Sequence, residues 1–404
     1  MASAPITPSG TRSGLARSHT LRRTGHHSAA VKAVYELRSP DVAKAARAVA
    51  IGQSIGNPDI RASRETEEMV KRHSATVEAI DGSRVTIRFP AVNFGRRDGI
   101  AYLMSVLMGG QMDIDLVESC HLVDVEFGSL LRRFPGPRYG LSGIRQLVGA
   151  HDRPLFGGIV KPKIGLKPEQ LAEVCHEMAA GGADFIKEDE ILGDPPWCPL
   201  KQRVPAVAEA LKGFKTLYAP CITADGDEVV RRARLAKKLG ATAIHVNIWS
   251  GLGAHLSVRK KVDLPLFFQK SGDKVLTTGP YAIRSALMCK FIRLIGCDFT
   301  HVGMWGGYLS EPEAELEARL DALQGSWCPR PGVIPSFSCG AHPGMVQALI
   351  KRFGHDIMIS SGGAIHGHPM GTRAGVQAFR QALDGQDPPP PELAAAIQTW
   401  GKVT

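Results

Sequence analysis

Hydrophobic and polar residues follow two different rhythms along the chain, and the rhythm changes near residue 150. Before that point, five segments follow one another: an alternating segment at 30–38, a helical pattern at 41–51, a hairpin pattern at 75–89, a helical pattern at 99–108 and an alternating segment at 121–127. This strand–helix–strand–strand–helix–strand order predicts a ferredoxin-like α+β domain over residues 29–134. A segment rich in Pro and Gly then begins a linker over residues 135–149.

From about residue 150, short apolar runs alternate with amphipathic segments. The runs begin near residues 155, 184, 215, 243, 264, 299, 333 and 356. Helical patterns such as PEQLAEVCHEMAAGG fill the gaps between them. Eight strand–helix units in a row predict an α/β domain over residues 150–404, built as a (β/α)₈ TIM barrel. In such barrels the chemistry lies on the rim formed by the carboxyl ends of the strands.

Composition narrows the class of protein further. The chain has 404 residues, of which 44% are hydrophobic and 22% charged, as in soluble globular proteins. Because no apolar run approaches the roughly 18–20 residues of a bilayer span, we expect no membrane association. The eight cysteines are scattered without a C-x-x-C pair, which indicates reduced thiols in a cytoplasmic protein.

The formal net charge of +10 is unevenly distributed. Residues 1–35 contain no Asp or Glu and carry half of it, and residues 1–28 are also rich in Ser, Thr and Gly. We predict a disordered basic arm there, although a start rich in Arg and Ser also resembles a transit peptide. The remainder is mildly basic and has no basic stripe interleaved with aromatic residues, so we expect no nucleic-acid binding.

The sharpest chemical signal is the run FIKEDE at the end of the second barrel strand. Lys187 and Asp189 share one face of the strand by its period of two, and Glu190 lies where the strand ends and can turn inward. A neutral lysine amine adds CO₂ to give a carbamate, which behaves as a carboxylate. That carbamate, Asp189 and Glu190 would supply three oxygen ligands suited to Mg²⁺. The alternative is a charged, solvated loop.

Two more lysines, Lys161 and Lys163, follow the first barrel strand in the run KPKIG. Their spacing of two predicts that both face the same pocket. Carbamylation requires a free amine, whereas the reference pKa of lysine is about 10.4. Because like charges close together favour the loss of a proton, this pair favours a neutral amine nearby.

Two segments resemble the RuBisCO large-chain family. The stretch FPGPRYGLSGIRQLVGAHDRPLFGGIVKPKIGL resembles a family segment of the same length that ends in K-P-K-x-G-L, and GGADFIKEDE resembles the family's G-G-x-D-F-x-K-D-D-E. The resemblance extends more weakly over about residues 30–385. It implies an α+β domain on a (β/α)₈ barrel, in a homodimer or an assembly of dimers whose active sites are shared between subunits.

The resemblance also implies roles for individual residues. Lys187 would be the carbamylated lysine, and Asp189 and Glu190 would be ligands of Mg²⁺. Lys161 would match the lysine that moves protons at the enediolate. Lys163 would match the lysine that helps to hold the carbamate and the substrate.

Further matches follow strands six, seven and eight. His301, in GCDFTHVGM, matches a family histidine near one phosphate, and Ser338 and Gly340, in SFSCG, match the family's S-G-G. Gly362 and Gly363 match glycines that bind a phosphate, since glycines let backbone N–H groups approach it and these loops form a recurring barrel phosphate site. The alternatives are a buried core histidine and simple tight turns.

The chain also departs from the family's pattern. Tyr308 stands where carboxylation requires a lysine, and Phe268 and Gln269 stand where a His-Arg pair clamps a second phosphate. In the N-terminal domain, the family's glutamate, Thr-Trp pair and asparagine align near Gly52, Asn57-Pro58 and Gly110. These departures indicate a RuBisCO-like protein of form IV with one phosphate site and no CO₂ fixation.

Three functions remain open. The leading prediction is a Mg²⁺-dependent enzyme that forms an enolate from a singly phosphorylated keto sugar or sugar acid, as a decarboxylase or C–C-cleaving enzyme of the 3-oxo-isoapionate 4-phosphate type. The alternative is an enolase or isomerase of methylthio-pentulose phosphates in methionine salvage, in which Phe268 could pack against the methylthio group. The third is a non-catalytic scaffold, which would leave the lysines and carboxylates described above without a role.

Overall fold

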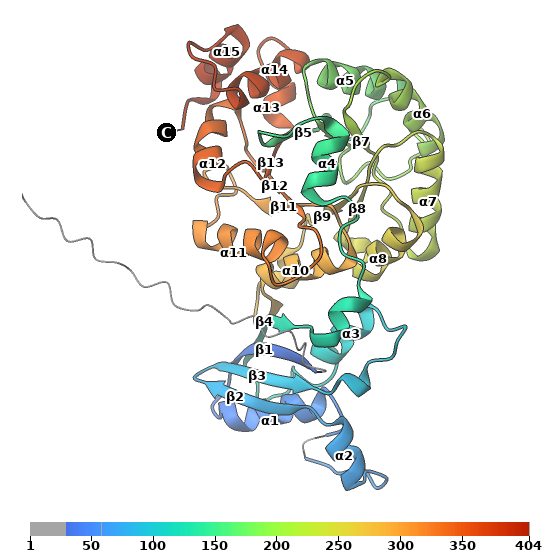
Figure 1. The fold of residues 1–404 in the computed structure, drawn as a ribbon, viewed down its shortest axis with the longest axis vertical. Helices are drawn as coiled ribbons and strands as arrows, with labels where there is room; N and C mark the ends of the chain where they lie inside the picture. Colours follow the sequence, from blue (N-terminus) through green and yellow to red (C-terminus); the bar gives the residue numbers. More distant parts are fainter. Residues whose placement is uncertain (1–29, 58, 404) are drawn as a thin grey trace, which may run out of the picture.

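The computed structural model describes residues 30–57 and 59–403, which form an N-terminal α+β domain and a barrel (Figure 1). The basic arm predicted for residues 1–28 lies outside the described residues. Across the described residues, every helix is too short or too polar to cross a bilayer.

The N-terminal sheet contains the four strands that the hydrophobic pattern predicts, in the spatial order β4-β1-β3-β2, with every neighbouring pair antiparallel. This is the strand order of a ferredoxin-like domain. The four strands are β1 (Val31–Arg38), β2 (Thr76–Asp81), β3 (Arg84–Phe89) and β4 (Ser119–Glu126). The helices of the domain are α1 (Val42–Gly52), α2 (Glu67–His73) and α3 (Ile100–Met108).

A fifth strand of this sheet comes from the barrel half of the chain, which the sequence pattern does not predict. Strand β10 (Tyr281–Ile283) runs parallel to β4 at the edge of the sheet. The N–H of Cys120 donates to the carbonyl of Pro280 at 2.8 Å, and the N–H of Arg284 donates to that of Leu122 at 2.9 Å. The two domains therefore share one hydrogen-bonded sheet, and the N-terminal domain is not built from residues 29–134 alone.

All eight predicted barrel strands are present and parallel. They are β5 (Leu155–Ile159), β6 (Phe185–Lys187), β7 (Leu217–Ala219), β8 (Ile244–Asn247), β9 (Leu266–Gln269), β11 (Phe299–Gly303), β12 (Ile334–Phe337) and β13 (Met358–Ser361). The barrel closes between β7 and β8, where the N–H groups of Ala243 and His245 donate to the carbonyls of Tyr218 and Pro220.

Helices surround the barrel on its outside (Figure 1). They are α5 (Pro168–Ala180), α6 (Leu200–Ala210), α7 (Gly226–Lys238), α8 (Leu252–Lys261), α10 (Ser285–Ile295), α11 (Glu313–Gln324), α12 (Val346–Phe353), α14 (Thr372–Leu383) and α15 (Pro391–Trp400). Two short helices, α9 (Lys274–Thr277) and α13 (Gly363–His366), lie at the carboxyl ends of the strands.

The segment predicted as a linker contains a helix, α4 (Gly140–Val148). Its apolar residues Ile144 and Val148 are buried with Leu155, Phe185 and Phe299, which lie at the starts of barrel strands. Helix α4 therefore closes the amino-terminal end of the barrel. The pattern of Pro and Gly before it marks the domain boundary but not this packing.

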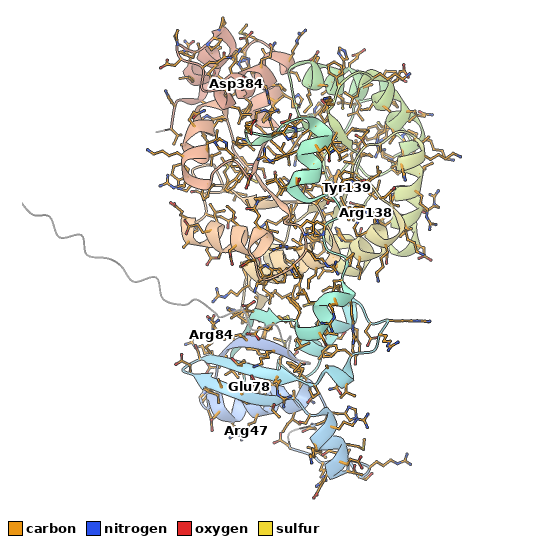
Figure 2. All side chains as sticks on the ribbon, viewed as in Figure 1. Arg47, Glu78, Arg84, Arg138, Tyr139 and Asp384 are labelled. Atoms are coloured by element: carbon orange, nitrogen blue, oxygen red, sulfur yellow. The ribbon has the colours of Figure 1, made fainter. Side chains whose placement is uncertain are left out.

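A buried carboxylate, Asp298, fixes the chain at the same end of the barrel. Its oxygens accept hydrogen bonds from the N–H groups of Tyr139, Gly140 and Leu266, and from Arg259 Nη1 at 3.0 Å. Figure 2 places Tyr139 in the barrel part of the molecule, beside the chain that enters α4. Asp298 thus ties the entry of α4 to strands β9 and β11 and to helix α8.

We expect Asp298→Ala to lower the free energy of unfolding by about 3–5 kcal/mol, because it leaves Arg259 charged and unpaired in the interior. The matched control is Asp356→Ala, which breaks an ion pair with Arg145 whose aspartate side chain is 69% exposed. The control should cost at most about 1 kcal/mol. Urea unfolding curves measure both, and equal losses would contradict the role of Asp298.

Candidate functional site

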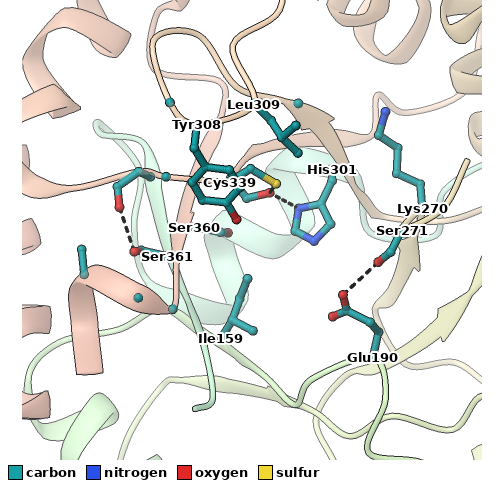
Figure 3. Close-up of a pocket in the computed structure, with 18 of the residues that line it drawn as sticks. Ile159, Glu190, Lys270, Ser271, His301, Tyr308, Leu309, Cys339, Ser360 and Ser361 are labelled. Carbon is teal, nitrogen blue, oxygen red and sulfur yellow. Dashed lines mark hydrogen bonds between the residues drawn. The ribbon is translucent and has the colours of Figure 1, made fainter. Parts of the chain in front are cut away.

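The carboxyl ends of the barrel strands surround a cavity of about 970 Å³ (Figure 3). Most of the residues singled out in the sequence line it, namely Lys161, Lys163, Glu190, His301, Ser338, Gly340, Gly362 and Gly363. The tertiary structure therefore gathers residues from strand β11 and from the loops after four other strands in one place. This is the rim on which barrel enzymes build their sites.

Lys187 and Asp189 lie below the floor of this cavity, and each is only 1% exposed. Asp189 Oδ2 accepts from Lys161 Nζ at 2.5 Å, and Lys187 Nζ lies 3.4 Å from Glu190 Oε2. These two ion pairs join the buried residues to lining residues Lys161 and Glu190. The three predicted metal ligands and the first lysine therefore form two neighbouring ion pairs at the end of β6.

The residue between Lys187 and Asp189 faces the other way. Glu188 is fully buried and accepts hydrogen bonds from Arg203, from the hydroxyl of Tyr218 at 2.5 Å and from the N–H of Cys221 at 2.8 Å. We call this arrangement the Glu188 clamp. It fixes which side chains of the strand end point inward, and the sequence analysis assigned no role to Glu188.

Burial is the main influence on Lys187. It lowers the pKa of this amine, while the negative charges of Glu190 and Asp189 act in the opposite direction. The sequence predicts a neutral amine here because Lys161 and Lys163 lie nearby. The pKa of Lys187 is indeed lowered, but the principal cause is its desolvation. A buried lysine with a lowered pKa has more of the neutral amine that reacts with CO₂.

The first two lysines lie beyond the end of β5, in the loop that follows Ile159 rather than on the strand itself. Lys163 is exposed, and Lys161 packs closely against the loop after β13. A Cβ atom at Gly362 would lie 2.9 Å from Lys161 Cε and 3.1 Å from the carbonyl oxygen of Ile159. Glycine at this position lets Lys161 reach Asp189.

The loop after β12 approaches the loop after β11 very closely. Gly340 has a φ of +102°, and a Cβ atom there would lie 2.8 Å from the backbone nitrogen of Tyr308. Cys339 has a φ of +79°, a conformation that costs most side chains energy. The cysteine therefore adopts backbone geometry that the family's glycine adopts freely. Across the cavity, Gly363 begins α13, where the first N–H groups of a helix lack partners within it.

His301 is buried beneath these loops and is held by one hydroxyl. Ser338 Oγ lies 2.9 Å from His301 Nδ1. Burial lowers the pKa of His301 to about 3, and the positive charge of Lys187 acts in the same direction. His301 is therefore a neutral hydrogen-bonding group at pH 7 and brings no positive charge to a phosphate.

The end of β9 corrects one expectation and adds a residue. Phe268 packs its ring against His255 of α8, 4.4 Å between centroids, so it faces the outer helices and cannot contact a substrate. The side chain of Gln269 donates to Ser271, whose hydroxyl donates to Glu190 Oε1 at 3.0 Å. The position of the lost arginine thus belongs to a network that orients a carboxylate.

Lys270, which the sequence analysis missed, lines the cavity next to this network. Its side chain is 12% exposed and pairs with Asp273 at 3.2 Å. Its position directly after a barrel strand was the feature of the sequence that could have identified Lys270 as a site residue. It provides a cation on this wall of the cavity, one residue along from the missing arginine.

The aligned N-terminal positions lie apart from the barrel cavity within one chain. Gly52 and Gly110 line a separate cavity in the N-terminal domain, where Gly110 N donates to Gln53 Oε1 at 2.8 Å. Asn57 belongs to neither cavity, and Pro58 lies outside the described residues. These positions therefore do not line the barrel cavity of their own chain.

The donor set fits a magnesium ion only if Lys187 is modified. Within residues 30–57 and 59–403, no group of three His, Cys, Asp or Glu side chains could hold a metal ion. Asp189 and Glu190 supply two oxygen-bearing side chains in one cluster, and a carbamate on Lys187 would supply the third. Hard oxygen ligands of this kind suit Mg²⁺.

Comparisons with known proteins agree with this geometry. Residues 140–400 match the family described as ribulose bisphosphate carboxylase large chain, catalytic domain. A 2,3-diketo-5-methylthiopentyl-1-phosphate enolase from Bacillus licheniformis is 33% identical over an alignment 408 residues long, gaps included, that covers 92% of this chain and 98% of the enolase. A ribulose bisphosphate carboxylase from Methanosarcina barkeri is 34% identical over 339 residues, 75% of this chain and 79% of the carboxylase.

Among solved structures, a rubisco-like protein from Alicyclobacillus acidocaldarius superposes with a TM-score of 0.81 at 30% identity, covering 92% of this chain and 100% of that one. The chain therefore belongs to the RuBisCO large-chain family, and its fold is the α/β barrel with an N-terminal α+β domain that this family shares. Its relatives include RuBisCO-like enzymes as well as carboxylases.

We predict that His366, the last residue of α13, destabilises the protein in acid. Burial lowers its pKa to about 4, with its ring near the carbonyl of Ile159. Below about pH 6.5 the unfolded chain gains a proton that the native state does not bind, so stability falls by about 1.4 kcal/mol per pH unit down to pH 4. Urea unfolding from pH 7 to 4.5 measures this slope, and His366→Gln should reduce it by that amount. An unchanged slope would contradict the assignment.

Proposed function

We propose that this protein is a Mg²⁺-dependent enolase that acts on a singly phosphorylated diketone of the 2,3-diketo-5-methylthiopentyl-1-phosphate type. The observation that carries the proposal is the two neighbouring ion pairs, Lys161–Asp189 and Lys187–Glu190, whose members Lys161 and Glu190 line the cavity together with the glycine loops. The relative that spans nearly the whole chain and bears this enolase name supports the choice of substrate class.

In this proposal each side chain has a defined task. Asp189, Glu190 and the carbamate of Lys187 would hold Mg²⁺, which would supply a positive charge to polarise the substrate carbonyl and stabilise negative charge that develops on its oxygen. Lys161 Nζ, partly exposed at the cavity and 2.5 Å from Asp189, transfers the proton at the carbon next to that carbonyl. Lys163 contacts the bound substrate from the exposed loop.

The remaining groups bind and orient the substrate. Backbone N–H groups at Gly340, Gly362 and Gly363 hold the single phosphate. His301 and Ser338, paired at 2.9 Å, offer neutral hydrogen bonds to a hydroxyl or carbonyl group. These contacts fix the carbon that loses its proton relative to the lysine that takes it.

The same arrangement disfavours carboxylation. Tyr308 is 79% exposed at the cavity mouth, and its phenol offers no cation to CO₂. A phenol has a pKa of about 10 and therefore remains protonated and uncharged at neutral pH. Gln269 is held by Ser271 and cannot clamp a second phosphate as an arginine would.

An apolar part of the cavity suits a methylthio group, although not through Phe268. Ile159, Tyr308 and Leu309 all line the cavity (Figure 3). Tyr308 and Leu309 lie on the loop after β11, and both are substantially exposed when no substrate is bound. A methylthio group placed against them would bury apolar surface on both sides.

The competing reading is a decarboxylase of the 3-oxo-isoapionate 4-phosphate type, and Lys270 is the observation that favours it. A cation on the cavity wall could bind the carboxylate of a sugar acid, and loss of CO₂ from a β-keto acid gives an enolate directly. A non-catalytic scaffold fits less well, because it gives the buried lysine–carboxylate cluster no task that would offset its desolvation.

The activation test uses Lys187→Ala, with Lys201→Ala on the exposed face of α6 as control. Without its third ligand the metal should be lost or misplaced, so Mg²⁺- and CO₂-dependent turnover should fall more than about 100-fold. The Lys201 variant should keep wild-type activity. Steady-state rates with and without Mg²⁺ and bicarbonate measure both, and a fully active Lys187→Ala protein would exclude this mechanism.

The substrate test compares three phosphorylated compounds. We expect enolisation or solvent deuterium exchange with 2,3-diketo-5-methylthiopentyl-1-phosphate and no fixation of ¹⁴CO₂ with ribulose bisphosphate. Losing a charge-assisted contact to the second phosphate weakens binding about 10–150-fold. Faster release of CO₂ from 3-oxo-isoapionate 4-phosphate, lost in Lys270→Ala, would favour the competing reading, and inertness towards all three would favour the scaffold.

A further inference from the structure

A buried histidine of the fourth barrel strand, His245, has no task in the site described above. It is fully buried, and neither of its ring nitrogens makes a hydrogen bond of normal geometry among the described residues, although the backbone carbonyl of Glu188 lies near the ring. Native proteins rarely leave a buried polar side chain without any partner, and such an exception calls for an explanation. His255 of α8 provides a contrast, since both of its ring nitrogens lie near backbone carbonyls, at 2.8 and 3.1 Å.

The side chain of His245 points into the barrel. On β8 it is in register with Phe267 of β9, and residues in register on neighbouring strands face the same side of a sheet. The ring of Phe267 packs inside the barrel against Phe185 and Phe299. Lys187 Nζ lies 5.9 Å from the centroid of that same ring. His245 and Lys187 therefore belong to one interior layer, directly below the cavity.

Its surroundings keep His245 neutral. Burial lowers the pKa of its imidazole well below the usual value, and the positive charge of Lys187 lowers it further. A neutral imidazole carries one N–H donor and one acceptor nitrogen. The interior layer thus contains an N–H donor without a well-formed hydrogen bond, near enough to Lys187 for the charge of that lysine to act on it.

We propose that His245 is a positioning residue that donates its N–H to the carboxylate formed when CO₂ adds to Lys187. This inference rests on the carbamylation proposed above. In that step the lone pair of the neutral amine bonds to the carbon of CO₂, one C–O π pair becomes the negative charge on oxygen, and the nitrogen releases a proton to solvent. A Mg²⁺ ion that took one carbamate oxygen would leave the other without a ligand, and in this buried layer that oxygen would require a hydrogen-bond donor.

The test measures the carbamate itself rather than activity. Full-length protein is equilibrated with ¹³C-labelled bicarbonate over a range of CO₂ concentrations, with and without Mg²⁺, and the carbamate carbon is quantified by ¹³C NMR. Lys187→Ala gives the background signal, because it has no amine at this position to form a carbamate. The variants are His245→Leu, which removes the donor, and His245→Asn, which retains an N–H donor. His255→Leu is the matched control, because it removes a histidine that is equally buried but already partnered.

We expect His245→Leu to weaken carbamate formation at least about tenfold, as the loss of a hydrogen bond to a charged group does. Its Tm without CO₂ should be unchanged or higher, because the replaced ring had no well-formed hydrogen bond. His245→Asn should restore most of the carbamate. His255→Leu should lower the Tm and leave the carbamate at the wild-type level.

Carbamate in His245→Leu within twofold of wild type would overturn the inference. If that variant does not fold, His245→Phe makes the same test with a larger apolar side chain. Failure of the underlying proposal looks different, since wild-type protein would then show no more carbamate than Lys187→Ala.

Discussion

The site depends on one buried constraint, the Glu188 clamp. Strand β6 has only three residues and ends in a run of four charged residues, 187–190. So short a strand does not by itself fix which of these side chains point into the barrel. Arg203 and Glu188, both fully buried, hold the middle of that run against α6 and β7. Taking such a pair out of water is costly, and breaking it costs more. The strand end therefore has one low-energy arrangement, in which Lys187 and Asp189 point into the barrel.

Burial then separates the lysines by chemistry. Lys187 lies in a dry layer with His245 and the ring of Phe267, where the charged amine is disfavoured. Lys161 reaches the cavity past Gly362 and is partly exposed, so it can exchange protons with solvent or substrate. In the proposed function the same residue type thus serves two purposes, one as an anchor for a modification and one as a carrier of protons, because the two sites differ in access to water.

The residues that differ from the carboxylase pattern make contacts of their own in this site. Gln269 no longer offers a cation to a phosphate but orients Glu190 through Ser271. Lys270 places a positive charge one residue further along, and Tyr308 lies over the glycine at position 340. In the proposed function, substrate preference is therefore set by the two loops after β9 and β11, while the ion pairs at the end of β6 serve the enolate chemistry.

The sequence alone determined the layers and the chemistry along each strand. Period-two and helical patterns located all eight barrel strands and the ferredoxin-like order, and the run FIKEDE identified the lysine–carboxylate cluster, because these signals are local. Strand β10, the packing of α4 and the buried ring of His245 depend on contacts between segments far apart in sequence. The direction of Phe268 also needed the structure. A shift of one residue along a strand decides whether a side chain points into the barrel or towards the surrounding helices. Only the register of neighbouring strands fixes that orientation.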